Sequence, residues 1–231
     1  MKKHNLRRAQ KMRLVLYAGG HVTGNKRIHL ALSKILGRKA RSLTYIPSSH
    51  ENGEYYFRRI RRRYAQYGFK KFRYFAVDSD FLMREMREAM KSDVIYLAGG
   101  NTFYFLKHLR ESGFLERLAR FAARGGVVAG LSAGAIIMTP TIELAGYPPP
   151  DADINEVKLK NLRALGLVDF EFLPHFSNSK QANTALFRYS RKTSHLIFAA
   201  PDGTGVVVNR GELQIFGPLY IFYRGKKVRL G

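Results

Sequence analysis

The chain contains no cysteine among its 231 residues. This absence excludes disulfide bonds, thiolate metal sites and a cysteine nucleophile. The chain also has no apolar run near the roughly 20 residues that a membrane-spanning helix needs, and the run from Leu14 to Ala18 is shorter than a typical signal-peptide core. We therefore expect a soluble protein of the cytoplasm that does not associate with a membrane.

Acidic residues are scarce. Lysine and arginine total 40 against 17 aspartates and glutamates, which gives a net charge of +23, and such a charge attracts polyanions or acidic substrates. The densest basic stretch, Arg58–Arg63, is interleaved with aromatic residues, as in surfaces that contact phosphates and stack on bases. The same pattern fits a solvated helix face, which we favour. Nucleic acid is therefore a partner that the composition allows but does not favour.

Short apolar runs alternate with amphipathic runs over the first 140 residues. This alternation predicts an α/β fold with a mostly parallel sheet and helices on both faces. Near the C-terminus, short runs separated by turn residues predict antiparallel strands. A hydrophobic content of 45% suits one core, so we expect a single domain over residues 1–231 whose basic residues 1–11 form a mobile tail. The expected strands are Leu14–Ala18, Ser42–Ile46, Phe72–Val77, Val94–Ala98, Val127–Gly130, Phe170–Leu173, Gly205–Asn209, Leu213–Phe216, Leu219–Tyr223 and Lys227–Leu230.

Ser132 lies between Gly130 and Gly134, directly after the apolar run Val127–Gly130. The pattern G-x-S-x-G is typical of a sharp turn from a strand into a helix, which exposes a serine oxygen above the sheet. Ala133 would be the first residue of that helix, and its N–H would point to where an oxyanion develops during acyl transfer. An incidental serine in a strand–helix turn is the alternative that the pattern alone leaves open.

A serine nucleophile needs a base, and His175 is the best placed of the seven histidines because it follows a predicted strand and a proline. His21 and His50 also lie in plausible loops. A second oxyanion donor could come from the segment 99–102, in which Asn101 could also cap the following helix. No histidines and carboxylates stand at metal-ligand spacing, so we predict neither a metal nor another cofactor.

Four ordered motifs carry a family resemblance: Ala98-Gly-Gly-Asn-Thr-Phe103, Gly130-Leu-Ser-Ala-Gly-Ala135, Pro140-Thr-Ile142 and Pro174-His-Phe-Ser-Asn178. Together they resemble the S51 serine peptidases, the group of peptidase E and cyanophycinase. The resemblance runs from about Leu14 to Phe216. It implies a three-layer α/β/α fold like that of the class I glutamine amidotransferases, which is flavodoxin-like.

The resemblance also implies roles for individual residues. Ser132 would be the nucleophile, His175 the general base and acid, and the N–H groups of Gly100 and Ala133 the oxyanion hole. Asn101 lies in the same motif as Gly100 and is a candidate substrate contact.

The chain departs from the peptidase E pattern in two places. The triad aspartate of that enzyme has Tyr147 as its counterpart here, so both the presence and the identity of an acid are open. We favour Asp153 over Asp151 and Glu143. The arginine that binds the acidic substrate side chain in peptidase E falls near Ala185, and Arg188 is the nearest later candidate, followed by Arg191.

The leading prediction is a serine peptidase of the S51 type that cleaves short peptides, with an N-terminal aspartyl residue as a candidate preference. Two alternatives remain open. A homologue with impaired catalysis could bind nucleic acid or ribosomes through its basic surface, which the missing aspartate would favour. An amidohydrolase could use the same machinery on another amide.

Overall fold

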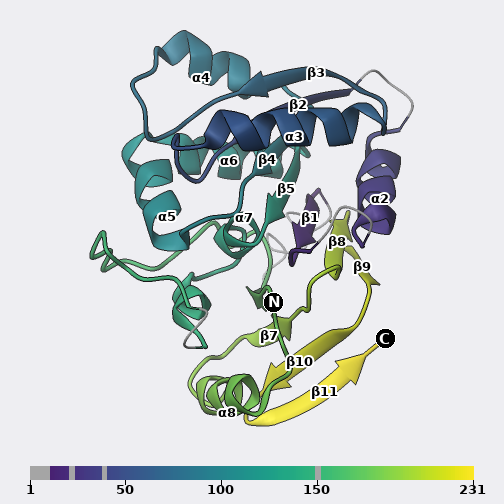
Figure 1. Ribbon diagram of the computed structural model, residues 1–231, viewed down its shortest axis with the longest axis vertical. Helices are drawn as coiled ribbons and strands as arrows, with labels where there is room; N and C mark the ends of the chain where they lie inside the picture. The colour runs from purple at the N-terminus through teal and green to yellow at the C-terminus, as the bar shows by residue number, and fades with distance from the viewer. Residues whose placement is uncertain (1–10, 21–23, 38–40, 149–151) are drawn as a thin grey trace.

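The computed structural model describes residues 11–20, 24–37, 41–148 and 152–231. Strands and helices alternate through the first two thirds of the chain, and strands dominate the last third (Figure 1). The elements are β1 (Arg13–Tyr17), α2 (Lys26–Leu36), β2 (Arg41–Ile46), α3 (Gly53–Ala65), β3 (Phe69–Tyr74), α4 (Met83–Ala89), β4 (Val94–Leu97), α5 (Thr102–Glu111), α6 (Phe114–Ala123), β5 (Val127–Leu131), α7 (Ala133–Ile137), η1 (Glu143–Gly146), β6 (Phe170–Leu173), α8 (Lys180–Tyr189), β7 (Leu196–Ala199), β8 (Gly205–Asn209), β9 (Glu212–Phe216), β10 (Leu219–Tyr223) and β11 (Lys226–Leu230).

Two sheets organise the molecule. The larger has seven strands in the order β3-β2-β4-β5-β1-β8-β9, of which the first five run parallel. The smaller has four strands in the order β11-β10-β7-β6, with β6 and β7 parallel. In Figure 1 the smaller sheet and α8 lie below the larger sheet. Loops at the carboxyl ends of parallel strands are where ligands collect in such folds.

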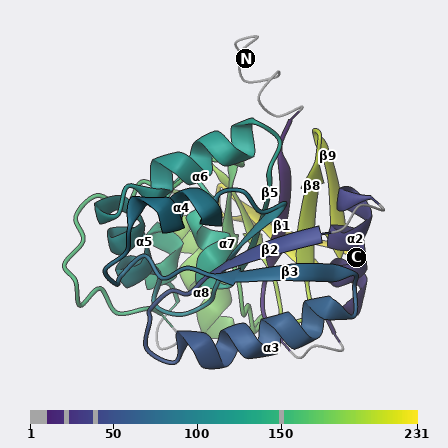
Figure 2. The same cartoon turned by 90° about the horizontal axis from the view of Figure 1, so that it is seen from above.

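Helices cover both faces of the larger sheet. Buried residues of α2 and α3 pack with one face of its strands, whereas those of α4, α5, α6 and α7 pack with the other. Figure 2 shows α3 on one side of the strands and α4 and α6 on the other. The mostly parallel sheet with helices on both faces that the alternating pattern predicted is therefore confirmed, as is the three-layer α/β/α fold that the resemblance implied.

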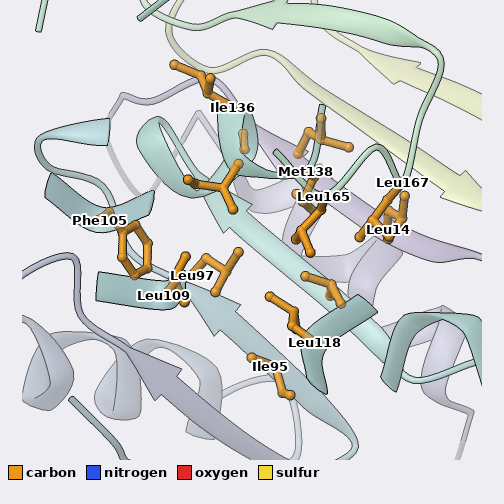
Figure 3. Close-up of a cluster of buried hydrophobic side chains, with 14 of the residues drawn as sticks. Leu14, Ile95, Leu97, Phe105, Leu109, Leu118, Ile136, Met138, Leu165 and Leu167 are labelled. Atoms are coloured by element: carbon orange, nitrogen blue, oxygen red, sulfur yellow. The ribbon is translucent and has the colours of Figure 1, made fainter. Parts of the chain in front are cut away.

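The core beneath α7 fixes the turn that precedes it. Ile136 and Met138 lie among apolar side chains of β4, α5 and α6, which Figure 3 draws together with Leu14 of β1. Leu97 and Phe105 are fully buried there. Burial of such side chains is the main favourable contribution to folding. The packing of α7 against this cluster therefore holds the turn at Ser132 in place.

Most predicted strands are present with shifted ends. The C-terminal strands are antiparallel as expected, but they are divided between the sheets, because β8 and β9 extend the larger one. Strand β7 was not predicted at all. Residues 1–10 of the predicted basic tail lie outside the described residues. No helix in the described part of the chain is long and apolar enough to cross a membrane.

Candidate active site

Ser132 occupies a sharp turn between β5 and α7. Its backbone has φ 50° and ψ −112°, a conformation that residues other than glycine rarely adopt. Its N–H donates to the carbonyl of Tyr17 at 2.9 Å, and its carbonyl accepts from the N–H groups of Ala135 and Ile136. Backbone strain of this kind costs about 1–3 kcal/mol and clusters at functional sites. These backbone hydrogen bonds thus fix the conformation of Ser132 at a sharp turn from a strand into a helix, as the G-x-S-x-G pattern predicted.

The two glycines of the pattern are required by close backbone approach. A Cβ on Gly130 would clash with the backbone of Gly134, and a Cβ on Gly134 would clash with the carbonyl of Leu97. The N–H of Gly134 donates to the carbonyl of Ala98 at 3.0 Å. Helix α7 therefore lies directly against β4 and β5, and the space for the turn exists only because both side chains are absent.

His175 lies beside the serine. Its Nε2 is 2.9 Å from Ser132 Oγ, although the two residues come from different sheets. The segment after β6 is held to the segment after β7 by two backbone hydrogen bonds, from Ala200 to Leu173 and from Phe176 to Ala200. His175 has φ 57°, a left-handed backbone conformation that residues other than glycine adopt infrequently. The structure thus brings Ser132 together with the histidine that was predicted to be its base.

The carboxylate at the other imidazole nitrogen belongs to Asp202. Its Oδ1 is 2.7 Å from His175 Nδ1, and it follows β7, the strand that the sequence analysis missed. The preference for Asp153 is therefore corrected. The carboxylate of Asp153 accepts from the N–H of Thr102 at 2.7 Å, at the start of α5. There it pairs a backbone donor that has no partner within the helix, and its negative charge interacts favourably with the positive end of the helix dipole.

Gly19 brings the end of β1 against this pair. A Cβ on Gly19 would collide with both the His175 ring and the Asp202 carboxylate. The Asp202 turn is tied to β1 by hydrogen bonds from Gly203 to the Gly19 carbonyl and from Ala18 to the Thr204 carbonyl. Three elements, β1, β6 and β7, thus fix the orientation of the imidazole.

The segment 99–102 borders the turn from the β4 side. A Cβ on Gly99 would stand 3.4 Å from that of Ser132, and Gly100 has φ 140°. Ala133 begins α7, where N–H groups have no partner within the helix. This placement suits the predicted oxyanion donors Gly100 and Ala133, whose role remains a prediction. Asn101 caps α5 through the N–H of Tyr104 and donates to the Ile154 carbonyl, so both ends of its amide are engaged within the protein.

The remaining histidine and acid candidates are placed elsewhere. His50 pairs with Asp78 at 3.0 Å, and Glu143 accepts from Tyr189 at 3.4 Å. His21 and Asp151 lie outside the described residues. No group of three or more histidines, aspartates or glutamates in the described ranges is arranged to hold a metal ion.

A model of peptidase family S51 matches residues 14–216. The chain belongs to peptidase family S51. Among curated S51 relatives, it is 32% identical to peptidase E of Salmonella arizonae over 147 residues, which are 59% of this chain and 62% of that enzyme. It is 42% identical over 89 residues to an uncharacterized peptidase of Listeria monocytogenes serovar 1/2a, which are 38% of this chain and 42% of that one. The alignments thus span about two fifths to three fifths of these relatives.

Two solved structures share the fold of this chain. A crystal structure of a peptidase from an acI-B1 Actinobacterium superimposes with a TM-score of 0.72 at 18% identity, covering 96% of this chain and 95% of that one. A crystal structure of a Listeria monocytogenes EGD-e protein superimposes with a TM-score of 0.69 at 22% identity, covering 88% and 97%. At these identities the likeness concerns the fold.

A small pocket of about 90 Å³ opens beside Ser132 and His175 in this S51 chain. Its other walls come from α7, η1 and the start of α5, and Tyr147 and Asp153 contribute to them. Arg188 is not among the residues that line it; this exposed side chain lies in the last turn of α8. A contact between Arg188 and a substrate therefore stays a prediction without support from this pocket.

Sequence reasoning missed Asp202 because it depended on counting from a motif. A signal was present: the apolar run Leu196–Ala200 is followed by Pro201, Asp202 and Gly203, which is the pattern of a strand ending in a turn. That run is parallel to β6, with Leu173 paired to Ala199. Neighbouring parallel strands end at the same edge, so a carboxylate after one can reach a histidine after the other.

Proposed function

We propose that the protein is a serine-type peptidase that hydrolyses short peptides through an acyl-enzyme on Ser132. One observation carries the proposal: the chain of hydrogen bonds from Ser132 Oγ to His175 Nε2 at 2.9 Å and from His175 Nδ1 to Asp202 Oδ1 at 2.7 Å. A serine is activated by an adjacent base, and the base is oriented by a third group. Membership of family S51 supports the peptidase class.

The proposed reaction has two halves. His175 Nε2 takes the proton as Ser132 Oγ bonds to the peptide carbonyl carbon, and the oxyanion forms near the N–H groups of Gly100 and Ala133. The C–N bond then breaks, and the imidazolium gives its proton to the leaving amine. Water, deprotonated by the same imidazole, attacks the ester, and the departing Ser132 Oγ takes the proton back. Asp202 holds the ring tautomer and stabilises the imidazolium throughout.

We infer an acidic peptide as the preferred substrate. The net charge of +23 raises the local concentration of anions around the molecule. The pocket next to Ser132 is small, which suits a short peptide. A cytoplasmic location is part of the same proposal, since the chain without cysteine is suited to a reducing compartment.

Amine release from a panel of dipeptides tests this function. Peptides with N-terminal aspartate are compared with their asparagine counterparts, and Ser132→Ala serves as the control. We expect hydrolysis by the native chain, faster for the aspartyl peptides, and none by the variant. Failure to cleave any peptide, or equal cleavage by Ser132→Ala, would contradict the proposal.

The nucleic-acid alternative loses one of its arguments. It was favoured by the missing aspartate at Tyr147, and Asp202 provides a carboxylate at the imidazole. Arginines 58, 59, 61 and 62 are exposed on α3, as a solvated helix face predicts. Binding of RNA whose affinity falls steeply with salt would restore this alternative.

A further inference from the structure

A cavity larger than the pocket beside His175 borders the 99–100 segment. Its volume is about 470 Å³, within the range of small-molecule sites. It runs between α3 and the carboxyl ends of β1, β2 and β4. Gly99, Gly100 and Leu131 form part of its wall, and Leu131 directly precedes Ser132. An occupant would therefore lie against the backbone that borders the serine.

Two buried polar side chains of this wall each have an atom without a partner. Asn25 and His29 are 2% and 1% exposed. Asn25 Nδ2 donates to the Gly19 carbonyl at 3.1 Å, whereas its Oδ1 and the Nε2 of His29 have no hydrogen-bond partner in the part of the chain that the structure describes. Buried polar atoms in proteins are nearly always hydrogen-bonded, so these two atoms indicate groups supplied by a ligand.

The protonation of His29 follows from its neighbours. Burial and the nearby positive charge of Arg63 lower its pKa to about 4, so the ring is neutral at pH 7. The hydroxyl of Tyr64 donates to that of Tyr17 at 2.9 Å, and the Tyr17 hydroxyl lies 3.1 Å from His29 Nδ1. The Tyr64 hydroxyl also lies 3.2 Å from Nδ1, so Nδ1 faces two hydroxyls that can donate to it. When Nδ1 accepts, the neutral ring carries its proton on Nε2, the nitrogen that has no partner among the described residues.

Arg63 supplies an unpaired positive charge at the same cavity. Its side chain is half-buried on α3, lines the cavity, and has a buried Nε without a partner among the described residues. No ion pair of Arg63 occurs within those residues. Arg59 and Glu51 also line the cavity but are exposed, and Arg59 donates to the Tyr55 hydroxyl. A partly desolvated guanidinium is best satisfied by a carboxylate.

Four tyrosines contribute to the rest of the lining, together with Pro47, Ser48, Ser49, Ile60 and small residues. Tyr45 and Tyr96 stack at 5.9 Å between ring centroids, and both belong to the wall with Tyr17 and Tyr56. Aromatic walls favour a flat apolar group. The ligand chemistry is therefore a carboxylate for Arg63 and His29, an N–H donor for Asn25 Oδ1, and an apolar body between them.

We propose that this cavity is a substrate subsite that binds the free C-terminal carboxylate of a peptide ending in an aromatic residue. Such a residue carries all three groups on one Cα atom: the amide N–H, the carboxylate and a flat aromatic side chain. The assignment as a substrate subsite rests on the proposed function, whereas binding of the carboxylate does not.

Calorimetry on the Ser132→Ala protein tests the binding. The probes are N-acetyl-phenylalanine and its carboxamide, which has the same shape without the charge. We expect the acid to bind at least about tenfold more tightly than the amide, because hydrogen bonds between charged groups are stronger than those between neutral ones. Arg63→Met should remove that difference. Arg62→Met is the matched control, since it deletes the same charge from an exposed position of α3 that does not line the cavity.

Equal binding of the two probes, no binding of either, or an equal loss in Arg62→Met would overturn the proposal. Should Arg63→Met unfold, Arg63→Lys replaces it: this variant keeps the charge but loses the planar fork of donors, and we expect a weaker preference for the acid. An undiminished preference in Arg63→Lys would contradict the role of the fork and with it the assignment.

Protection of Ser132 tests the subsite. N-acetyl-phenylalanine should slow labelling of Ser132 by a fluorophosphonate in the native chain and not in Arg63→Met. Binding without protection would show a separate site and overturn the subsite assignment. If Ser132 is not labelled at all, the proposed function fails, and the calorimetry still decides whether the cavity binds the carboxylate.

Discussion

Replacing Asp202 by asparagine tests the orienting role of its carboxylate. The bond from Asp202 Oδ1 to His175 Nδ1 is 2.7 Å long, and a hydrogen bond to a charged group contributes about 1.5–3 kcal/mol. A loss of that size slows a reaction roughly 10- to 150-fold. The amide could also donate to Nδ1 and so favour the wrong ring tautomer. In a buried triad the corresponding change costs about 10⁴-fold.

Solvent exposure sets the expected effect between these limits. The side chains of His175 and Asp202 are 50% and 56% exposed, so water screens their interaction and replaces part of it. We therefore expect Asp202→Asn to slow the reaction of Ser132 about 100-fold, which corresponds to about 2.7 kcal/mol. The assay is the second-order rate constant for fluorophosphonate labelling, which does not require a known substrate.

Asp153→Asn is the matched control. The asparagine oxygen can still accept from the N–H of Thr102, so the cap of α5 survives. We expect its labelling rate to stay within about threefold of the native rate, as for substitutions that cost under about 0.5 kcal/mol. A full rate in Asp202→Asn, or an equal loss in Asp153→Asn, would refute the assignment of the acid.

Three further outcomes follow from the geometry. Gly19→Ala should slow labelling of Ser132 at least about 100-fold, because the added methyl group displaces the His175 imidazole. Gly37 also has a positive φ but has open space around it, so Gly37→Ala should lower the stability of the protein without slowing the labelling. Similar labelling rates in both variants would contradict this reasoning. Ser132→Gly should be about 1 kcal/mol more stable to urea than Ser132→Ala, since only glycine relieves the strain at φ 50°; equal stability would argue against strain. The pKa of His29 is about 4 in the folded chain and about 6.5 in the unfolded chain, so the unfolded chain binds this proton first as the pH falls. Between about pH 6.5 and pH 4 the free energy of unfolding of the native chain should therefore fall by up to about 3 kcal/mol more than that of His29→Gln. Parallel pH profiles of stability would count against a neutral buried imidazole.

The sequence predicted those parts of the site that depend on local pattern. The turn around Ser132 follows from two glycines that allow close backbone approach, and the strands follow from short apolar runs. His175 could be found because a strand and a proline precede it. Each of these inferences uses residues that are near one another in the chain.

Two features that depend on contacts between distant segments, the Asp202–His175 pair and the cavity at Arg63, were not predicted. Asp202 reaches His175 because β6 and β7 are parallel neighbours in one register, and β7 itself was not recognised. The cavity at Arg63 combines α3 with loops after three strands. Within Arg58–Arg63, sequence could not separate the one half-buried guanidinium from its four exposed neighbours, since helical spacing shows which face is apolar but not which cation faces a cavity.

The site of covalent modification tests the central claim most directly. Peptide mapping by mass spectrometry after fluorophosphonate treatment should find the adduct on Ser132 in the native chain and none in His175→Ala. An adduct on another residue, or equal labelling of Ser132 without the imidazole, would contradict the account of a serine activated by His175.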